Sequence, residues 1–359
     1  MNIFNNKFYQ FVSYPFSLIY KIIICVRNLL YDKKIFRSLK VINCKVISVG
    51  NISVGGTGKT PVIKFLAVYL KEMGFKVAIL SRGYRRKSKG IVIVSDGKQI
   101  LAGLHRAGDE PHLLARQLKN IPIVVEADRY KGALLIQKKF KPDVILLDDG
   151  YQHRRLHRDF DIVLVDASVG FGRGFLVPTG FLREPVSSLR RADLIWFTRI
   201  DQSKNINKLT KQVRNFSSNP YVTSEHRAIE IIQASTGNRF HLSYLDHKRV
   251  FLFSGIANPA SFEKTVTNLG VQVVHHLKFS DHYNYKTIDI IKITAEAQNT
   301  DAELVLTTEK DYVRIIEPVP NLSKIYYLAI EIQIGNYEHI LKNSLSSVLS
   351  NSSKHQATI

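Results

Sequence analysis

The sequence predicts an α/β fold: a doubly wound, mostly parallel sheet that carries a phosphate-binding loop, with a second, smaller α/β domain. Two observations predict it. Short apolar runs rich in β-branched residues alternate with helical patterns through most of the chain, and this alternation is typical of parallel sheets. One such run, Lys45–Val49, leads directly into a glycine-rich segment and a helical pattern, which is the context of a phosphate-binding loop.

The loop itself is a short glycine-rich segment whose glycines let backbone N–H groups turn toward phosphate oxygens, while the next helix adds partial positive charge at its N-terminus. Lys59 is expected to reach the β- and γ-phosphates, and the Thr60 hydroxyl to bind Mg²⁺. Ser53 stands where the general pattern has glycine, so the subclass of loop is unusual. We assign nucleotide binding to Ser53, Val54, Gly55, Gly56, Thr57, Gly58, Lys59 and Thr60.

The other elements follow in chain order. Pro61 lies in the first turn of the helix after the loop, where a missing N–H costs nothing, and apolar residues recur at helical spacing as far as Leu70. A helix is expected to begin at 109–111 and another after 130. Buried strands are expected at 76–80, 91–95, 121–125, 143–149, 161–166, 192–198, 250–254, 271–279, 303–308 and 326–332.

Composition suggests how these elements are grouped. Apolar density falls in the polar stretch 202–219, and we place the domain boundary shortly after it. The expected organisation is an amphipathic helical segment at 1–35 within the first domain, a phosphate-loop domain at 36–222, a smaller α/β domain at 223–345 and a frayed tail at 346–359.

The net charge of +21 at neutral pH indicates a polyanionic partner, which is a nucleic acid, an anionic membrane or a phosphorylated substrate. The only two cysteines, Cys25 and Cys44, have no metal-ligand spacing around them. This usage fits a reducing compartment without a disulfide framework or a zinc site.

The first 35 residues are apolar and aromatic, interrupted by Pro15, Lys21 and Arg27. No uncharged stretch reaches the ~18–20 residues of a spanning helix, and no small-residue cleavage site follows. Lysines and an arginine come directly after the segment. These features predict an amphipathic helix that lies in a membrane interface. A helix packed on the protein's own core is the alternative, and the two interpretations are compatible.

Two acids end the apolar run 144–147. Asp148 or Asp149 would hold Mg²⁺ beside the phosphate-binding loop, although paired acids at a strand end also serve as helix N-caps. The sequence suggests no structural role for the next residues, Gly150-Tyr-Gln-His153. Two basic groups then face either phosphate or solvent: Arg82, Arg85, Arg86, Lys87 and Lys89 around Tyr84, and Arg154, Arg155, His157 and Arg158.

Several short motifs occur together and in order, although each alone is weak. They are Gly50-Asn51 with Gly55-Gly-Thr-Gly-Lys-Thr-Pro61, Ser81-Arg-Gly-Tyr84, Gly108-Asp-Glu-Pro111, Asp148-Asp-Gly-Tyr-Gln-His153, Pro178-x-Gly-x-Leu-Arg-Glu-Pro185, Phe279-x-Asp-His282 and Leu306-Thr-Thr-Glu-Lys-Asp311. As a set they resemble the tetraacyldisaccharide 4'-kinases of lipid A biosynthesis, over roughly Gly50 to Arg314. That family also lacks the first loop glycine, so Ser53 is no departure from it.

The resemblance implies transfer of the γ-phosphate of ATP, with Mg²⁺, to the 4'-hydroxyl of a tetraacylated glucosamine disaccharide 1-phosphate. It implies a site at the cytoplasmic face of the bacterial inner membrane. The family's aspartate and histidine match Asp109 and His282. Asp109 opens a helix whose dipole keeps it ionised, and His282 would raise its basicity and relay the proton. Because the two belong to different expected domains, they would act together only on closure.

Further roles follow from the same resemblance. Asp281, Lys59 and Arg183 join the catalytic set, with Arg183 bridging the disaccharide phosphate or the charge of the transition state. An ion pair with Glu184 or a neighbour is the alternative for Arg183. Acceptor binding is expected at Asn51, Arg82, Gln152, His153 and Arg183.

Three function classes fit the residues: a lipid kinase, a nucleotide switch or assembly factor at a membrane, and an ATPase that binds nucleic acid. A switch needs no base for an acceptor hydroxyl, so Asp109 and His282 favour the kinase. The apolar N-terminal segment and the absence of a nucleic-acid motif argue against the third class. We therefore expect a monomer whose partners are an anionic lipid substrate and the membrane surface, and no nucleic acid.

Overall fold

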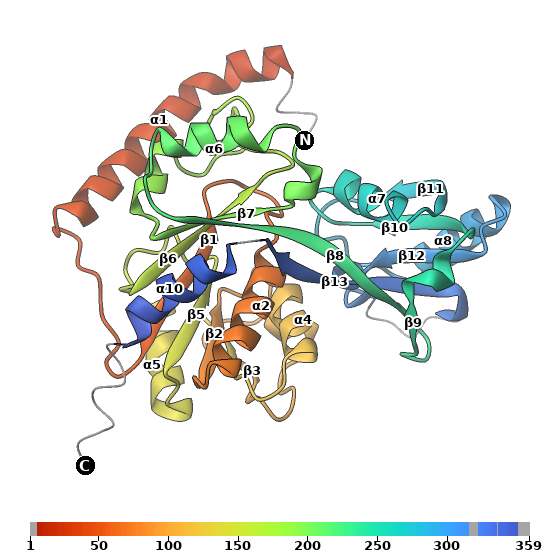
Figure 1. Cartoon of the computed structure of the whole chain (residues 1–359), viewed down its shortest axis with the longest axis horizontal. Coiled ribbons are helices and arrows are strands. Elements are labelled where there is room, and N and C mark those ends of the chain that lie inside the picture. The colour runs from red at the N-terminus through yellow and green to blue at the C-terminus, as the bar shows by residue number, and fades with distance from the viewer. Residues whose placement is uncertain (1–5, 316–321, 336, 351–359) are drawn as a thin grey trace. The chain divides into compact units, whose positions relative to one another are not determined.

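The computed structural model of the chain describes residues 6–315, 322–335 and 337–350. Contacts group these residues into two compact units, one up to Glu225 and from Ile334 onward, the other His226–Gln333. The chain leaves the first unit within β8 (Tyr221–Gln233) and returns within β13 (Ile325–Ile334). Helix α10 (Glu338–Leu349) therefore belongs to the first unit, although the sequence analysis grouped most of it with the second (Figure 1).

The first unit contains a mostly parallel sheet in the order β8-β7-β6-β1-β5-β2-β4-β3, in which only β3 is antiparallel to its neighbour. The predicted doubly wound fold is confirmed. After β1 the chain builds β2 to β5 on one side of that strand and β6 to β8 on the other, so β1 ends at the switch point where ligands bind. The strands are β1 (Lys45–Asn51), β2 (Val77–Ser81), β3 (Val92–Ser95), β4 (Ile123–Val125), β5 (Val144–Asp148), β6 (Phe160–Asp166) and β7 (Leu194–Thr198).

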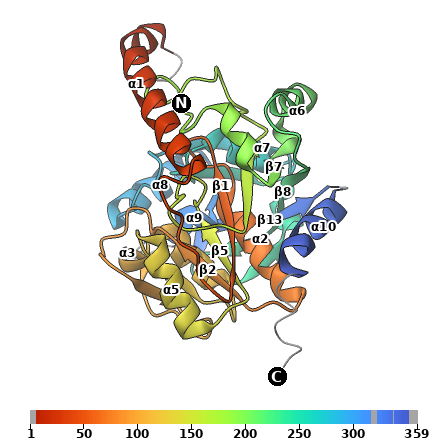
Figure 2. The same ribbon diagram turned by 90° about the vertical axis from the view of Figure 1, so that its left-hand side faces the viewer.

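Helices cover both faces of this sheet. Side chains of β5 alternate between the faces, and Ile145 and Leu147 pack under Ala133 and Ile136 of α5. Helix α2 lies on the face away from α5 (Figure 2), and α4 contacts α2. The helices of this unit are α1 (Lys7–Asp32), α2 (Lys59–Glu72), α3 (Leu104–Ala107), α4 (Asp109–Gln117), α5 (Arg129–Phe140), α6 (Ile206–Arg214) and α10.

The second unit has a sheet in the order β11-β10-β12-β13-β8, with β9 antiparallel on β8. The pairs β11–β10, β10–β12 and β12–β13 are parallel. Its own elements are β9 (Arg239–His241), β10 (Arg249–Ser254), α7 (Pro259–Thr267), β11 (Gln272–Lys278), α8 (Thr287–Asn299), β12 (Leu304–Thr308) and α9 (Glu309–Tyr312).

Two segments differ from the sequence expectation, whereas the N-terminal helix is present as α1 and continues through Pro15 to Asp32. The polar stretch 202–219 contains a helix, α6, because Leu209 and Val213 lie one turn apart and are both buried. The expected frayed tail begins inside α10, where Leu349 is buried, and residues 351–359 lie outside the described part of the chain.

Helix α1 docks through small polar side chains. The hydroxyls of Ser13 and Ser17 lie 3.0 and 2.7 Å from Thr179 Oγ1, and Asn28 Nδ2 donates to Glu184 Oε2 at 2.9 Å. All five of these residues are buried. Polar atoms inside the protein are tolerated when they are paired, so this polar face fixes the helix to the first unit.

The opposite face of α1 is apolar and exposed. Phe11 exposes 81% of its surface and Phe8 76%, which is unusual for aromatic side chains. The other large apolar side chains exposed along the helix are Val12, Tyr14, Phe16, Leu18, Ile19, Ile22, Ile23, Val26 and Leu29. Helix α1 is also long and apolar enough to cross a membrane. For a single helix near the N-terminus, length and composition are weak evidence of a membrane span.

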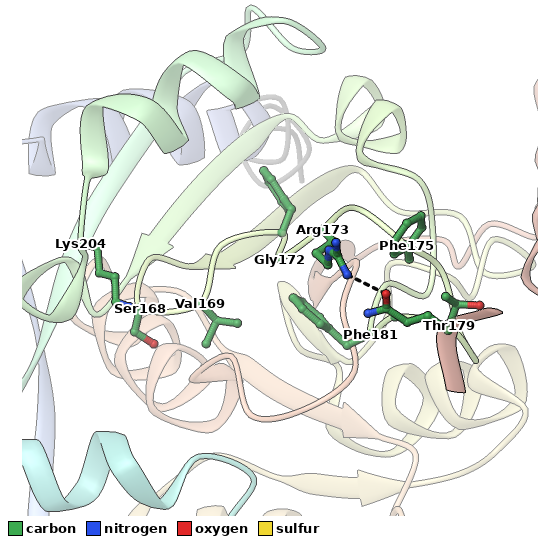
Figure 3. A pocket seen from close by; sticks show the side chains of 11 residues that line it. Ser168, Val169, Gly172, Arg173, Phe175, Thr179, Phe181 and Lys204 are labelled. Carbon is green, nitrogen blue, oxygen red and sulfur yellow. Dashed lines mark hydrogen bonds between the residues drawn. The ribbon is translucent and has the colours of Figure 1, made fainter. Parts of the chain in front are cut away.

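A pocket of about 270 Å³ adjoins α1 (Figure 3). Its lining combines aromatic rings with two cations, Arg173 and Lys204. Arg173 Nη1 donates to Oε1 of Gln10, a residue of α1, at 2.6 Å. The pocket therefore presents apolar surface beside positive charge, next to the exposed face of the N-terminal helix.

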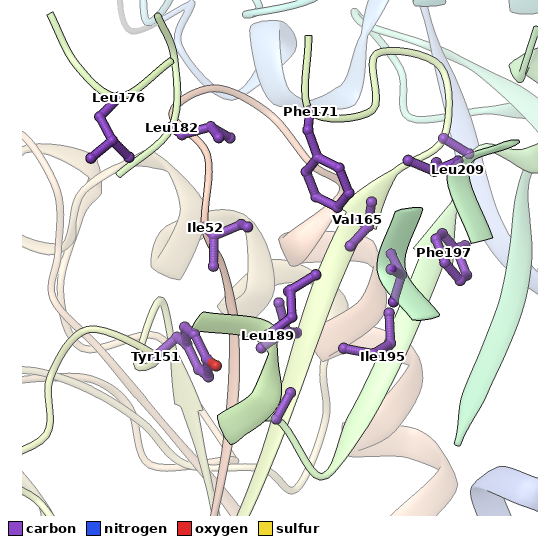
Figure 4. Close-up of a cluster of buried hydrophobic side chains, with 14 residues drawn as sticks. Ile52, Tyr151, Val165, Phe171, Leu176, Leu182, Leu189, Ile195, Phe197 and Leu209 are labelled. Atoms are coloured by element: carbon purple, nitrogen blue, oxygen red, sulfur yellow. The ribbon is translucent and has the colours of Figure 1, made fainter. Parts of the chain in front are cut away.

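A buried apolar cluster anchors the start of the phosphate-binding loop (Figure 4). Ile52, directly after β1, packs there with Val165 of β6 and Phe197 of β7. Leu209 of α6 belongs to the same cluster. The loop thus leaves a rigid base formed by the three central strands.

Candidate functional site

The phosphate-binding loop joins β1 to α2. Gly55 and Gly58 have φ values of +102° and +82°, which residues with a Cβ rarely adopt. Lys59, Thr60 and Pro61 are the first three residues of α2. The N–H groups of a first helical turn have no partner within the helix, so this end is suited to bind an anion.

Residues far along the chain hold the loop in place. Arg199, in a left-handed conformation after β7, donates from Nη1 to Gly56 O at 2.9 Å and pairs with Asp166. Thr198 Oγ1 donates to Thr57 O, also at 2.9 Å. These contacts fix two consecutive carbonyls outward from the loop, which leaves the N–H side for phosphate.

Asn51 is fully buried at the end of β1 and spans the loop from inside. Its Nδ2 donates to Thr57 Oγ1 at 2.9 Å, and its Oδ1 lies 3.5 Å from Lys59 Nζ. Gln152 donates from Nε2 to the carbonyl of Asn51 at 2.9 Å. Both residues, expected to bind the acceptor, therefore support the loop in this structure.

The two acids at the end of β5 have different surroundings. Asp148 is buried and accepts from Ser81 Oγ at 2.7 Å. Asp149 is half-exposed, takes both carboxylate bonds from Arg183 Nη1, and lies 3.4 Å from Lys59 Nζ. The ion pair of Arg183 is thus with Asp149, and not with Glu184.

These surroundings separate the pKa values of the two carboxyls. Burial, with the carboxylates of Glu110 and Asp149 nearby, raises the pKa of Asp148 to about 7. Burial also acts to raise the pKa of Asp149, but Lys59 and Arg183 outweigh it and hold that pKa well below its usual range. Asp149 is therefore always ionised at neutral pH, whereas Asp148 is poised to lose a proton when a cation arrives.

The donor set fits Mg²⁺. Among the described residues, no three histidine, cysteine or acidic side chains gather to hold a metal alone. Mg²⁺ needs no such cage, because it binds through one or two carboxylates, water and substrate phosphates. Asp148, Asp149 and the Thr60 hydroxyl at the start of α2 supply protein ligands of that kind.

An arginine that the sequence analysis did not single out lies beside these acids. Arg129 is buried, and its Nη1 donates to the carbonyls of Glu126 and Ala127 at 3.2 and 3.0 Å. Burial lowers its pKa to about 10, against the effect of Asp148, so it keeps its charge. Its Nε has no hydrogen-bond partner among the described residues. Because Arg129 opens α5, its charge opposes the helix dipole, which is a signal readable from sequence.

Two other predicted acceptor residues lie near this arginine. Burial, and then the charge of Arg129, lowers the pKa of His153 to about 4, so the ring is neutral at pH 7. His153 Nε2 is buried and without a hydrogen-bond partner in the described part of the chain. Arg82 follows β2, is exposed, and repels the charge of Arg129. The carboxyl ends of β2, β4 and β5 therefore gather positive charge around the two acids.

The two predicted proton-handling residues lie in different units. Asp109 is buried and opens α4, as predicted. His282, in the second unit, has a φ of +61° and donates its backbone N–H to Gly255 O at 3.0 Å. Its Nε2 lies 3.9 Å from Asp281 Oδ2. A left-handed backbone at a non-glycine residue marks a position that its surroundings hold in place.

The motif around Asp149 has structural partners, contrary to the sequence interpretation. Tyr151 is fully buried and its hydroxyl donates to Ser188 O. Three arginines of this region form ion pairs: Arg154 with Asp32, Arg155 with Asp128 and Arg158 with Asp161.

Comparison with known proteins identifies the family. The family described as tetraacyldisaccharide-1-P 4'-kinase matches residues 9–350. The tetraacyldisaccharide 4'-kinase of Syntrophus aciditrophicus is 39% identical, over 91% of this chain and 90% of its own, and that of Pelobacter propionicus is 38% identical, over 84% and 82%.

A solved structure of the Aquifex aeolicus family member in complex with ATP superposes with a TM-score of 0.74 at 34% identity. It covers 93% of this chain and 98% of its own. The chain belongs to the tetraacyldisaccharide 4'-kinase family. It is an ATP-dependent kinase, and the predicted nucleotide chemistry is confirmed.

Seen as a kinase site, the first unit brings most predicted residues to one edge. Lys59, Asp149 and Arg183 are in contact, with Asn51 and Gln152 supporting them. The residues that sequence reasoning missed are Arg129 and Arg199. Arg199 gave no signal, since its partner Gly56 lies 143 positions away.

Proposed function

We propose that this kinase transfers the γ-phosphate of ATP to the 4'-hydroxyl of a tetraacylated glucosamine disaccharide 1-phosphate in lipid A biosynthesis. One observation carries the proposal: a phosphate-binding loop, its lysine and two carboxylates of opposite pKa shift share a sheet edge in a chain that matches this family over residues 9–350.

On the nucleotide side, Lys59 and the N–H groups at the start of α2 neutralise the phosphates. Asn51 and Arg199 keep the loop shaped for this task. Arg183 exchanges its bond with Asp149 for oxygens of the transferred group, because a guanidinium binds two oxygens at once. Positioning and charge neutralisation supply most of the rate in this chemistry.

Asp148 is the acid that we assign to direct Mg²⁺ binding, with Thr60 and Asp149 beside it. Mg²⁺ held by these residues would supply positive charge against the charge that develops on the phosphates. Burial, followed by the charges of Glu110 and Asp149, raises the pKa of Asp148. Asp149 already has Lys59 and Arg183 as partners.

On the acceptor side, Asp109 receives the proton of the 4'-hydroxyl, and His282 acts with it. A carboxylate at a helix N-terminus stays ionised, and an ionised carboxylate is the form that accepts a proton. Arg82, Arg129 and His153 surround the acids with groups that recognise the anionic, hydroxyl-rich headgroup.

The acceptor is a membrane lipid, and α1 supports the placement of the enzyme at the cytoplasmic face of the inner membrane. The helix turns its polar face to the protein and its aromatic face outward, which suits burial in the interfacial layer. The adjacent pocket, apolar with Arg173 and Lys204, suits an acyl chain that bears an anionic headgroup. ATP and reducing conditions are found on that side.

The test is transfer of label from [γ-³²P]ATP to lipid. The purified full chain is incubated with the disaccharide 1-phosphate acceptor in mixed micelles, and in parallel with an acceptor whose 4'-hydroxyl is already phosphorylated. Label in the first lipid alone supports the proposal. If both lipids become labelled, the phosphate is transferred to another position of the lipid.

A matched control separates kinase activity from slow hydrolysis. Lys71 lies on the same helix as Lys59, but in its last turn. Lys71→Ala is expected to label lipid at the wild-type rate, and Lys59→Ala to label none. Release of inorganic phosphate without lipid labelling in the wild type would favour a nucleotide switch and overturn the proposal.

A further inference from the structure

The backbone of one glycine, Gly255, holds His282, the candidate histidine of the second unit, in place. Gly255 follows β10; its N–H donates to Asp311 Oδ1 at 3.0 Å, and its carbonyl accepts the N–H of His282, also at 3.0 Å. A Cβ at this position would lie 3.0 Å from both Tyr283 Cβ and the Tyr285 hydroxyl. A side chain here would crowd both tyrosines, so the close approach favours glycine, and the His282 backbone is hydrogen-bonded to it.

The same carbonyl binds a buried arginine. Arg314 Nη1 donates to Gly255 O at 2.8 Å and to Asp311 Oδ1 at 3.1 Å. The side chain of Arg314 is 1% exposed and that of Asp311 0%. Thr308 Oγ1 and the Tyr285 hydroxyl donate to Asp311 as well. A planar guanidinium held at two points inside the protein has one orientation.

That orientation brings Arg314 Nη2 to 3.3 Å from His282 Nδ1. A guanidinium has only donors and does not lose its proton in proteins. Nδ1 must therefore be the acceptor, with its lone pair toward Arg314, and the neutral ring carries its proton on Nε2.

We propose that Arg314 is a positioning residue that fixes His282 as the Nε2–H tautomer, so that the ring offers a hydrogen-bond donor during phosphoryl transfer. The role in transfer rests on the function proposed above. The relay expected from sequence is then revised. The neutral ring has a lone pair only at Nδ1, where Arg314 already donates, so it has no free site for a relayed proton. Asp109 remains the base, and His282 stabilises negative charge through Nε2–H.

The second unit holds its own reference for this assignment. His276 lies 2.8 Å from Ser254 Oγ through Nε2 and 2.8 Å from Glu263 Oε2 through Nδ1. Hydrogen bonds, first from His276 and then from Lys278, lower the pKa of Glu263, so an ionised carboxylate accepts the Nδ1 proton. Burial lowers the pKa of His276 and keeps its ring neutral. His276 is therefore the opposite tautomer, Nδ1–H.

Nitrogen NMR distinguishes the two tautomers, because a ring nitrogen without a proton resonates far downfield of one with a proton. The full chain, labelled with ¹⁵N at histidine and held in detergent micelles, is recorded at pH 8. His282→Gln and His276→Gln assign the two spin systems by loss of signal. We expect an unprotonated Nδ1 for His282 and an unprotonated Nε2 for His276. A protonated Nδ1 in His282 overturns the proposal.

Arg314→Met tests the cause. Once the donor is removed, His282 should show both tautomers, and kcat should fall about tenfold or more with the KM for ATP unchanged. Unchanged His276 signals confirm that the unit is folded. Loss of Arg314 leaves Asp311 buried without its cation, and if the variant unfolds, the wild-type spectrum still decides the tautomer. A folded Arg314→Met protein with only Nε2–H at His282 refutes the role of Arg314.

Two substitutions test the donor itself. The amide nitrogen of glutamine reaches the place of Nε2, whereas that of asparagine reaches only the place of Nδ1. His282→Gln should retain at least about tenfold more kcat than His282→Asn. Equal losses overturn the donor role. Full activity in both variants removes His282 from the reaction and leaves the tautomer assignment standing, so the two failures are distinguishable.

Discussion

Arg183 grips both carboxylate oxygens of Asp149 with one nitrogen, its Nη1 lying 3.0 Å from Oδ1 and 2.9 Å from Oδ2. Lys59 approaches the same Oδ1 at 3.4 Å. One acid thus pairs with both cations that we assign to the transferred phosphate. When the nucleotide binds, phosphate oxygens must replace the carboxylate oxygens that contact these two cations. Loss of either cation should therefore impair phosphoryl transfer.

Lys59→Ala should abolish turnover without loss of the fold. It removes the charge that faces the transferred group, and losses of this kind reach about 10²-fold or more in kcat. Steady-state kinetics at saturating ATP measures the effect, and circular dichroism checks the fold. Wild-type rates in a folded Lys59→Ala protein would remove the phosphate-binding assignment.

Mg²⁺ should release a proton from Asp148. The pKa of this carboxyl is raised to about 7, so roughly half of the protein molecules carry a protonated Asp148 at that pH. Mg²⁺ requires the ionised form. The affinity for Mg²⁺ therefore falls as the pH drops through that pKa and reaches its full value above it. We expect the affinity to change by about tenfold between pH 6 and 8.

Calorimetry of the ATP-bound enzyme in two buffers of different ionisation enthalpy counts the protons released. Because ATP itself titrates in this range, Asp148→Asn serves as the control, and the proton in excess of the control is the measured quantity. Equal release by the wild type and Asp148→Asn contradicts the assignment.

The two faces of α1 should separate membrane binding from stability. Serine at Phe11, Phe16 and Ile22 should weaken binding to anionic vesicles by more than about tenfold, or ~1.4 kcal/mol, because exposed apolar area is lost. The melting temperature should stay constant. High salt should also weaken binding of the wild type, since part of the attraction is electrostatic.

Asn28→Ala is the opposite case. It removes a donor from the buried carboxylate of Glu184 and should cost about 1–3 kcal/mol of unfolding free energy, with vesicle affinity unchanged. Vesicle sedimentation and thermal melts check both variants. Salt-insensitive attachment of the wild type would instead favour a helix that spans the membrane.

Asp109 and His282 should both serve the chemical step, in separate roles. Each alanine variant should lower kcat with little change in the dissociation constant for ATP, because neither residue is assigned to the nucleotide. Since Asp109 accepts the proton and His282 stabilises negative charge, the two losses in free energy should be close to additive in the double variant. A double variant barely worse than the more damaging single one would mean a shared proton relay, and loss of ATP binding in Asp109→Ala would move that aspartate to the Mg²⁺ site.

Contiguous segments made much of the site predictable. The phosphate-binding loop, the acids after β5 and the start of α4 each consist of a few neighbouring residues whose chemistry depends on a strand or helix end that sequence reveals. Arg199 was missed because its role depends on Gly56, a partner 143 positions away. For Arg129 a signal did exist, a positive charge placed against a helix dipole, but the sequence analysis did not use it.

Helix α6 and the orientation of α1 were not predictable for a different reason. Two buried apolar residues suffice for α6 within an otherwise polar stretch. In α1, Ser13, Ser17, Ile24 and Asn28 lie on one helical face, but the pattern does not say whether protein or solvent covers it. Only the partners Thr179 and Glu184 settle that question.

The polar docking of α1 has a practical consequence. The polar residues that attach this helix to the first unit and the exposed apolar residues form separate sets. The two sets can therefore be redesigned independently. A chain with polar substitutions only on the outward side should keep its native architecture and dissolve without detergent. Such a protein would permit crystallisation and solution studies of the kinase without micelles, with a water-soluble acceptor analogue in place of the natural lipid.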